Sequence, residues 1–169
     1  MDEKGIGPDV FKDLMSAVAS TVTVVTAGGV DGPIGMTVSA FTSVSVDPPI
    51  VLACIDKAVG SLPGYLTADG FTVNFLPESA EAEATLFATK GADRFGSVPW
   101  KGPSVSEAGP ILDIAFGNFQ CVTVEQVEMG DHWVIFGRVD AGGRTSSGVL
   151  PLLHVERHYA AVAERTPDA

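Results

Sequence analysis

The sequence predicts a mainly β protein, folded as a closed antiparallel barrel with helices at its periphery. Runs rich in β-branched and aromatic residues recur along the chain, and roughly seven of them have the length of a strand. Only two or three segments carry apolar residues at helical spacing. Strands do not alternate regularly with helices, which favours a barrel over a doubly wound parallel sheet.

The N-terminal region is expected to contain one helix and two strands. The helix begins with Asp9 as its cap and runs to about Ala19. Residues 21–27 form a β-branched run typical of a central strand, and a glycine-rich turn at 28–32 separates it from a strand that starts near Ile34. The apolar residues on one face of the helix are Val10, Phe11, Leu14, Met15 and Val18.

Residues 35–52 are the stretch around which we expect the rest of the chain to be organised. β-forming residues there are interspersed with hydroxyl side chains, until Pro48 and Pro49 end the second strand. The stretch permits two interpretations. Its strand pair can present hydroxyls and backbone N–H groups to a polar planar ligand, or it can be an ordinary Ser/Thr-rich hairpin on a half-exposed sheet. The hydroxyl residues are Thr37, Ser39, Thr42, Ser43 and Ser45.

The remaining elements alternate between short helices, strands and one long loop. Ser79 is expected to cap a second helix. The irregular residues 90–109 are expected to form a long functional loop rather than a linker, because Phe95, Val98 and Trp100 can pack. Residues 151–162 fit a final strand or a helix equally well. The other predicted elements are a strand at 50–55, a short helix at 62–68, a strand at 71–76 and a long hairpin formed by 115–128 and 133–141.

Size, charge and cysteine content limit the classes of function. A chain of 169 residues fits one domain, 1–169, with a core of about 10–160 and flexible tails. Ten basic against 21 acidic residues give a net charge of −11, which argues against nucleic acid and anionic membranes as partners. Cys54 and Cys121 lie in apolar runs, so we expect free thiols and no metal site. Without a leader or an apolar run long enough to span a bilayer, a cytoplasmic location is expected.

Motifs of other enzyme classes are absent, and one resemblance covers most of the chain. There is no GxGxxG, GxxxxGK[ST], HExxH or GxSxG motif. The segment GMTVSAFTSVSVDPPIVLACID at 35–56 resembles the flavin-binding signature of the short-chain flavin reductases. Weaker matches follow in FTVNFL at 71–76, GADRF at 91–95 and GDHWVIFGRV at 130–139.

This resemblance implies a fold, an activity and partners. The fold is the FMN-binding split barrel, a Greek-key antiparallel barrel of six strands with peripheral helices, usually a homodimer. The activity is hydride transfer from NADH or NADPH to FMN or FAD, with the reduced flavin passed to a partner monooxygenase. Scattered basic residues favour NADH slightly. Two alternatives remain: a non-catalytic flavin carrier on the same barrel, and an assembly protein that docks an oxygenase.

The resemblance also assigns residues to the ends of the flavin. The segment that lines the ring corresponds to Thr37, Val38, Ser39 and Ala40, and the neighbouring strand end to Cys54, Ile55 and Asp56. Each of these small residues can also serve strand packing alone. Lys57 and Ser61 are the candidates for the phosphate. The chain departs from the family pattern at Val59, where relatives usually carry a serine, and weak flavin binding is one expected consequence.

Four further residues complete the predicted site. Arg94 resembles the family arginine near the flavin tail, with Phe95 beside it, although an ordinary ion pair would also explain the arginine. His132 resembles the histidine that faces the nicotinamide and is the one candidate for a catalytic role. Tyr159 stands where relatives carry the second of two tyrosines, and His154 replaces the first. No metal ligand is assigned.

Overall fold

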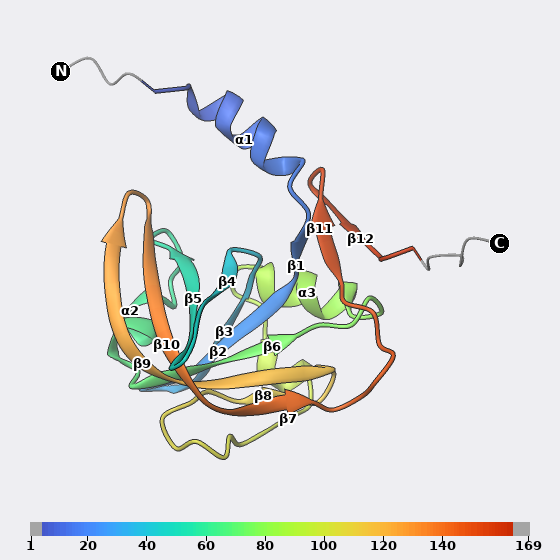
Figure 1. The fold of residues 1–169 in the computed structure, drawn as a ribbon. Coiled ribbons are helices and arrows are strands. Elements are labelled where there is room, and N and C mark those ends of the chain that lie inside the picture. Colours follow the sequence, from blue (N-terminus) through green and yellow to red (C-terminus); the bar gives the residue numbers. More distant parts are fainter. Residues whose placement is uncertain (1–4, 164–169) are drawn as a thin grey trace.

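A computed structural model describes residues 5–163 and gives a barrel from which one helix projects (Figure 1). The expected tails fall mostly on residues 1–4 and 164–169, outside the described residues. The mainly β, antiparallel class is confirmed. The strands are β1 Ser20–Thr21, β2 Thr23–Gly29, β3 Gly32–Val38, β4 Phe41–Val46, β5 Pro49–Asp56, β6 Gly70–Phe75, β7 Trp100–Lys101, β8 Ile111–Leu112, β9 Gly117–Met129, β10 His132–Arg144, β11 Leu153–Val155 and β12 His158–Ala160.

The largest sheet has seven strands, one more than the expected six, in the order β3-β2-β6-β9-β10-β5-β4. All neighbouring pairs in this sheet are antiparallel. The edge strands β3 and β4 follow one another in sequence, with only Ser39 and Ala40 between them. The chain therefore crosses the seam of the barrel at this point.

The hydroxyl-rich stretch is consequently not one hairpin, and that expectation was wrong. β3 pairs with β2 and β4 pairs with β5, so the two strands lie at opposite edges of the sheet. On the β4 side of this crossing, the backbone N–H of Cys54 on β5 donates to the carbonyl of Ala40 at 2.9 Å, which extends the β4–β5 pairing. The hydroxyl of Thr23 donates to the carbonyl of Val38 at 2.6 Å on the other side. The crossing segment is thereby fixed between the two edges.

The helices lie outside the barrel, and two of the predicted caps were wrong. The helices are α1 Pro8–Ser16, α2 Leu62–Thr67, α3 Glu81–Ala88 and α4 Arg94–Ser97. Gly7 precedes α1 in place of Asp9, and Ala80 precedes α3 in place of Ser79, each without a side-chain cap. The ambiguous C-terminal segment forms two short strands, β11 and β12, which join β1 in a separate sheet.

Two hydrophobic clusters hold this arrangement. One fills the barrel and includes Val25, Ile55 and Phe71, each no more than 2% exposed. The other lies under α3 around Phe87, which is fully buried. Gly35 on β3 permits the close contact with α3, because a Cβ there would lie 2.8 Å from the ring of Phe87.

Buried polar groups tie the irregular loop between β7 and β9 to the sheet. The amide oxygen of Asn74, which is fully buried, accepts from the backbone N–H of Leu112 at 2.9 Å. Its amide nitrogen donates to the carbonyl of Pro110 at 3.3 Å. Buried polar groups of this kind are costly unless paired, so these bonds specify one position for the loop. The sheet residues whose side chains bond to the loop backbone are Thr26, Thr72, Asn74 and Gln120.

Candidate functional site

A basic cavity lies between β3, α3 and the loop that follows β5. Its volume is about 440 Å³, and it is lined by Met36, Thr37, Ala58, Val59, Gly60, Ser61, Phe87, Ala88, Lys90, Gly91 and Arg94. The cavity combines two cationic side chains with the hydroxyl residues Thr37 and Ser61. This donor set suits an anionic group such as a phosphate. Val59 contributes an apolar patch to the wall.

Arg94 is held by backbone carbonyls. Its guanidinium donates to Gly35 at 2.9 Å and to Thr89 at 2.8 Å, which links β3 to the segment after α3. Its Nε is buried and has no hydrogen-bond partner among the described residues. Arg94 therefore holds together two segments of the cavity wall, and its guanidinium group also lines the cavity. The alternative of an ion pair with an acidic side chain is not what the structure shows.

Lys57 does not line this cavity. Its ammonium group forms a salt bridge with Glu128 and donates to the carbonyl of Gly130 at 2.6 Å. Lys57 thus fastens the end of β5 to the tip of the β9–β10 hairpin. Lys90, which is exposed and lines the cavity, occupies the position that the sequence interpretation gave to Lys57.

The segment 37–40 runs from the basic cavity to the seam of the barrel. The hydroxyl of Thr37 donates to the carbonyl of Ala84 at 2.5 Å, so it anchors β3 to α3. Val38 is buried in the barrel core, while Ser39 and Ala40 are exposed. The part of this segment that a ligand can reach is therefore mainly its backbone and the side chains of Ser39 and Ala40.

The end of β5 lies across the seam from this segment. Cys54 is half-buried, and desolvation raises the pKa of its thiol. The side chain of Ile55 is fully buried in the core, so only its backbone can serve a ligand. Asp56 accepts from the backbone N–H of Ala58 at 2.7 Å and thereby shapes the loop that leads into the basic cavity.

His132 stands at the start of β10, directly opposite Asp56 in the sheet register. Its Nδ1 lies 2.7 Å from a carboxylate oxygen of Asp131. This hydrogen bond lowers the pKa of the Asp131 carboxyl group. The His132 side chain is partly exposed. The first residues of β10 pair with Cys54–Asp56 at the end of β5. His132 therefore lies beside the predicted ring-binding segment without lining the basic cavity.

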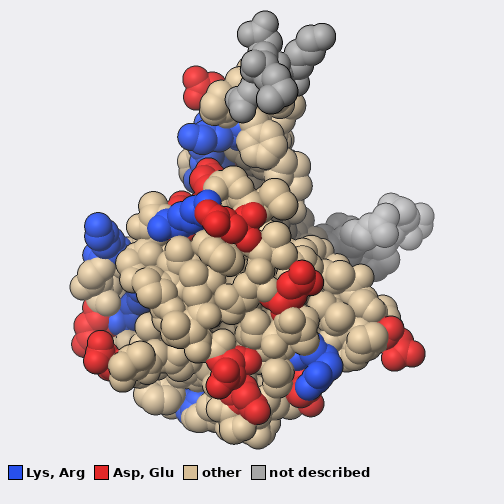
Figure 2. Space-filling model, turned by 90° about the vertical axis from the view of Figure 1, so that its left-hand side faces the viewer, with Lys and Arg blue, Asp and Glu red and all other residues tan. Residues whose placement is uncertain are grey.

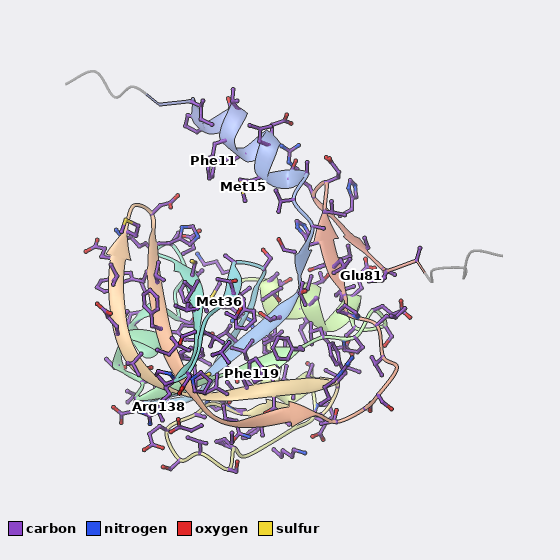
Figure 3. All side chains as sticks on the ribbon, in the orientation of Figure 1. Phe11, Met15, Met36, Glu81, Phe119 and Arg138 are labelled. Atoms are coloured by element: carbon purple, nitrogen blue, oxygen red, sulfur yellow. The ribbon has the colours of Figure 1, made fainter. Side chains whose placement is uncertain are left out.

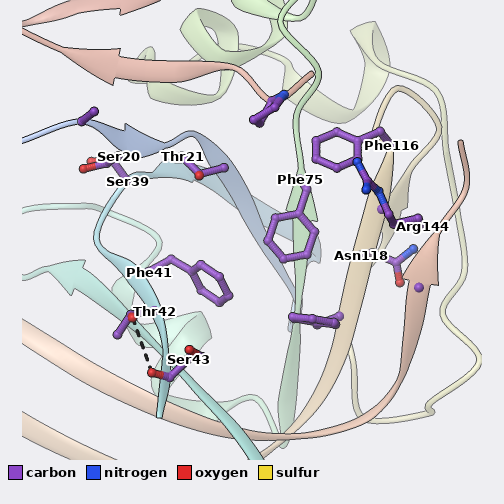
Figure 4. A pocket seen from close by; sticks show the side chains of 15 residues that line it. Ser20, Thr21, Ser39, Phe41, Thr42, Ser43, Phe75, Phe116, Asn118 and Arg144 are labelled. Carbon is purple, nitrogen blue, oxygen red and sulfur yellow. Dashed lines mark hydrogen bonds between the residues drawn. The ribbon is translucent and has the colours of Figure 1, made fainter. Parts of the chain in front are cut away.

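A second and larger cavity, which we call the aromatic cavity, opens on the other side of Ser39 (Figure 4). Its volume is about 680 Å³, and Arg144 stands over the ring of Phe116 with its guanidinium carbon 5.4 Å from the ring centroid. Hydroxyl groups of Ser39, Thr42 and Ser43 lie along one wall. The rings that line it belong to Phe41, Phe75, Phe116 and Phe119.

The last two predicted residues take different positions. Phe95 packs edge-on against Phe87 and Trp100 and lies partly buried beside Gly35. Tyr159 packs against His154 with their ring centroids 5.8 Å apart, and it joins the cluster under α3. Neither residue lines the basic or the aromatic cavity. Within the described residues, Phe95 and Tyr159 therefore contribute to packing.

The described residues contain no cluster of three His, Cys, Asp or Glu side chains that could hold a metal ion. No helix in this part of the chain is long and apolar enough to cross a bilayer.

The sequence did not single out Lys90 as a site residue, because nothing in its neighbourhood distinguishes it from other exposed lysines. Lys90 lies two residues after the end of α3. This position indicates a place in the cavity only once it is known that α3 packs against β3.

Comparison with known proteins identifies the family. A family model described as a flavin reductase like domain matches residues 15–163. The chain belongs to the flavin reductase-like family. A flavin reductase (NADH) of Kitasatospora aureofaciens is 36% identical over 154 residues, which are 90% of this chain and 80% of that protein. A probable flavin reductase of Rhizobium meliloti (strain 1021) is 38% identical over 135 residues, and the match spans 79% of this chain but 43% of that relative.

Solved structures give the same result for the fold. The NADH:FAD oxidoreductase of Streptomyces globisporus C-1027 matches this flavin reductase-like chain with a TM-score of 0.86 at 28% identity. The match covers 98% of this chain and 100% of that one. The same oxidoreductase in complex with NAD and FAD fragments gives a TM-score of 0.85 at 30% identity, over 98% of this chain and 99% of that one. The predicted family and fold are therefore confirmed.

The residues present fit what a flavin requires in this flavin reductase-like fold. A flavin phosphate needs cationic and hydroxyl donors, and the basic cavity supplies Ser61, Lys90 and the buried, unpaired Nε of Arg94. The polar edge of the ring needs backbone donors and acceptors, which the exposed segment at Ser39 and Ala40 can provide. Val59, where the resemblance predicts a serine, lines the same cavity and offers it no hydroxyl.

Proposed function

We propose that this chain is a flavin reductase that uses NADH to reduce FMN or FAD. The observation that supports this most directly is the basic cavity beside the exposed seam segment, in a chain whose family match spans 15–163. The phosphate of the flavin would lie near Ser61, Lys90 and Arg94. Its ring would lie along residues 37–40, with the end of β5 on the opposite side of the seam.

The bound cofactors supply the chemistry, because hydride passes from the nicotinamide to the flavin without an obligatory protein acid or base. The residues of this chain bind and orient. Ser39, Ala40 and the backbone at Ile55 would fix the flavin ring, and His132 would position the nicotinamide by a hydrogen bond. Holding the reacting atoms about 3–3.5 Å apart and excluding water are the contributions expected of the fold.

The proposal extends to partners and location. Curated relatives include the reductase component of a trigonelline monooxygenase in Acinetobacter baylyi, 31% identical over 94% of this chain. By analogy, we propose that the reduced flavin serves a partner monooxygenase. The exposed apolar face of α1 supports a homodimer. A cytoplasmic location suits the two free thiols.

A flavin carrier without turnover is the second candidate. Two observations favour it: Val59 removes a hydroxyl from the phosphate end, and His154 packs on Tyr159 where relatives carry a tyrosine. A carrier would retain flavin through purification and would show negligible reduction. The alternative of a docking protein for an oxygenase predicts complex formation that does not depend on flavin.

Steady-state oxidation of NADH tests the proposal. The purified chain is mixed with FMN, FAD or riboflavin, and the loss of the NADH absorbance band is followed, with NADPH in parallel. Flavin-dependent oxidation is expected, with NADH preferred. A His132→Gln variant should raise the KM for NADH more than the KM for flavin. If neither nicotinamide is oxidised with any flavin, the chain is not a flavin reductase.

A further inference from the structure

Three hollows lie in a row along β3 and share their walls. The first is the basic cavity, which reaches the strand at residues 36–37. The second, of about 290 Å³, reaches the strand at 33–35, and the third, of about 490 Å³, lies at 29–34 around the β2–β3 turn. Ser61 lines all three, so they form one groove, which we call the β3 groove. Met36, labelled in Figure 3, lines the first part of this groove and packs against the barrel core.

The β3 groove is longer than FMN requires. Between Gly32 and Thr37 the strand advances about 17 Å, at the usual rise of an antiparallel strand. FMN ends at the phosphate that the basic cavity would hold, whereas FAD continues with a second phosphate, a ribose and an adenine. FMN would therefore leave the second and third hollows unoccupied.

Arg94 stands between the first two hollows and is the cation best placed for a pyrophosphate. Its guanidinium donates to the carbonyl of Gly35 at 2.9 Å, and Arg94 lines both hollows. The buried Nε has no hydrogen-bond partner among the described residues. On the face of the molecule that Figure 2 shows, basic side chains are scattered among acidic ones, so an anionic ligand depends on local cations of this kind. Adjacent phosphates on either side of Arg94 can share its charge.

The donors of the basic cavity suit a phosphate within a chain better than a terminal phosphate. A terminal phosphate carries about two negative charges near neutral pH, whereas each phosphate of a pyrophosphate diester carries a single charge. Lys57 is turned away to the β9–β10 hairpin, and Val59 offers no hydroxyl. The donors that remain are Ser61, Lys90 and Arg94, and this small set matches the lower charge of a diester.

Two carboxylates farther along the groove can accept hydroxyl groups of a ribose. Asp93 lines the second hollow, and one of its oxygens accepts from the backbone N–H of Gly96 at 3.0 Å. Asp31 lines the third hollow and is exposed in the β2–β3 turn. A carboxylate repels a further anion but accepts hydrogen bonds from neutral hydroxyls. This part of the groove therefore favours a nucleoside.

The third hollow is partly apolar and suits a flat base. Pro33 and Ile34 of β3 are half-buried there, and Val30 at the hairpin turn is 95% exposed. The close approach of α2 to β3 depends on Gly64, because a Cβ at this position would lie 2.6 Å from the side chain of Ile34. An adenine can bury one face against these apolar side chains, which the packing of α2 on β3 holds in place.

We propose that this chain binds FAD in preference to FMN, and that the β3 groove holds the adenosine diphosphate half of FAD. Arg94 would pair with the pyrophosphate, Asp31 would accept a ribose hydroxyl, and the third hollow would hold the adenine. The inference rests on the proposed function for the position of the flavin ring. Because the ring is the same in FMN and FAD, the preference is decided by groove residues that lie away from the reacting atoms.

Isothermal titration calorimetry of the flavin-free chain with FAD and with FMN tests the preference without nicotinamide or turnover. FAD should bind at least about tenfold more tightly than FMN, because it gains the contacts of the second and third hollows. Equal affinities, or tighter binding of FMN, would overturn the preference and leave a reductase for FMN standing. If neither flavin binds, the proposed function itself fails, and this inference fails with it.

The variant Asp31→Ala tests the groove. Its affinity for FAD should fall about three- to tenfold, and its affinity for FMN should stay unchanged. Asp31 is exposed and belongs to neither hydrophobic cluster, so the variant should fold. The matched control is Asp113→Ala, which removes an exposed carboxylate outside the groove and should change neither affinity. Unchanged binding of FAD to Asp31→Ala, or an equal loss for both flavins, would overturn the placement of the adenosine.

Photolabelling locates the adenine directly. FAD that carries an azido group on the adenine is bound to the chain and irradiated, and the labelled peptides are identified by mass spectrometry. Label is expected within residues 29–34 or 60–67, and an excess of unmodified FAD should prevent it. Label in the residues of the aromatic cavity, or label that excess FAD does not reduce, would overturn the proposal.

Discussion

Lys90 is the exposed cation of the basic cavity, and Lys90→Gln is the most informative substitution for the proposed flavin site. Glutamine retains much of the length and a hydrogen-bond donor but removes the charge. The side chain is exposed and contributes to no hydrophobic cluster, so the fold should be unaffected. The effect should therefore be confined to anionic ligands.

The expected magnitude follows from the exposure of Lys90. A hydrogen bond to a charged group contributes about 1.5–3 kcal/mol when it is shielded from water. Solvent and salt screen an exposed ammonium group, which lowers the figure to about 1–1.4 kcal/mol and corresponds to a roughly five- to tenfold weaker Kd. The loss should diminish as the ionic strength rises.

Comparison of FMN with riboflavin isolates the phosphate, because riboflavin lacks it. Quenching of flavin fluorescence on titration gives both affinities. Lys90→Gln should weaken FMN and leave riboflavin unchanged, and Lys101→Gln, an exposed lysine on β7 outside the cavity, should change neither. Equal losses for FMN and riboflavin would refute the assignment of Lys90 to the phosphate, as would an FMN affinity that does not change.

Three further predictions concern stability and reactivity. Asn74→Ala should lower the free energy of unfolding by about 1–3 kcal/mol in urea titrations, because the buried N–H of Leu112 loses its acceptor. A loss below about 1 kcal/mol would argue against this network. Glu156→Asn/Arg157→Gly, in the β11–β12 turn where both residues have positive φ, should raise that free energy by about 1 kcal/mol, since these residues adopt positive φ more readily, and an unchanged midpoint would contradict the strain in the turn. Burial raises the pKa of the Cys121 thiol from 9.0 to about 12. The contribution of the neutral thiol to folding stability is therefore complete below pH 9.0, the pKa in the unfolded chain, and is lost as the pH rises toward about 12, the pKa in the folded chain. In the folded chain near neutral pH this thiol should not react with Ellman's reagent, and rapid reaction without unfolding would refute its burial.

The sequence was sufficient for the class of fold because strand and helix periodicities are local. The β-branched run that became β2 and the apolar run that became β5 were recognisable within one or two residues of their observed limits. The seam segment at Ser39 and Ala40 was recognisable by its hydroxyl-rich surroundings and by the family motif. His132 was assigned to the nicotinamide side of the site only by resemblance, and the register of β5 with β10 is what places it opposite Asp56.

Other features depend on contacts between residues far apart in the sequence. The hydroxyl-rich stretch looked like a hairpin because adjacent strands usually pair, yet β3 and β4 take opposite edges of the sheet. Lys57 and Lys90 are both lysines near a predicted loop, and only packing of the hairpin tip and of α3 decides which one faces the cavity.

The amino-acid sequence by itself determined that this chain is a mainly β member of a flavin reductase family, because periodicity and motif spacing are properties of neighbouring residues. The tertiary structure decided which side chains meet. It separated the basic cavity from the aromatic cavity and left α1 without a cover. Burial and charge pairing arise only once distant strands are brought together. The hydrogen-bond donors of the basic cavity and the exposed apolar face of α1 could therefore be identified only from the tertiary structure.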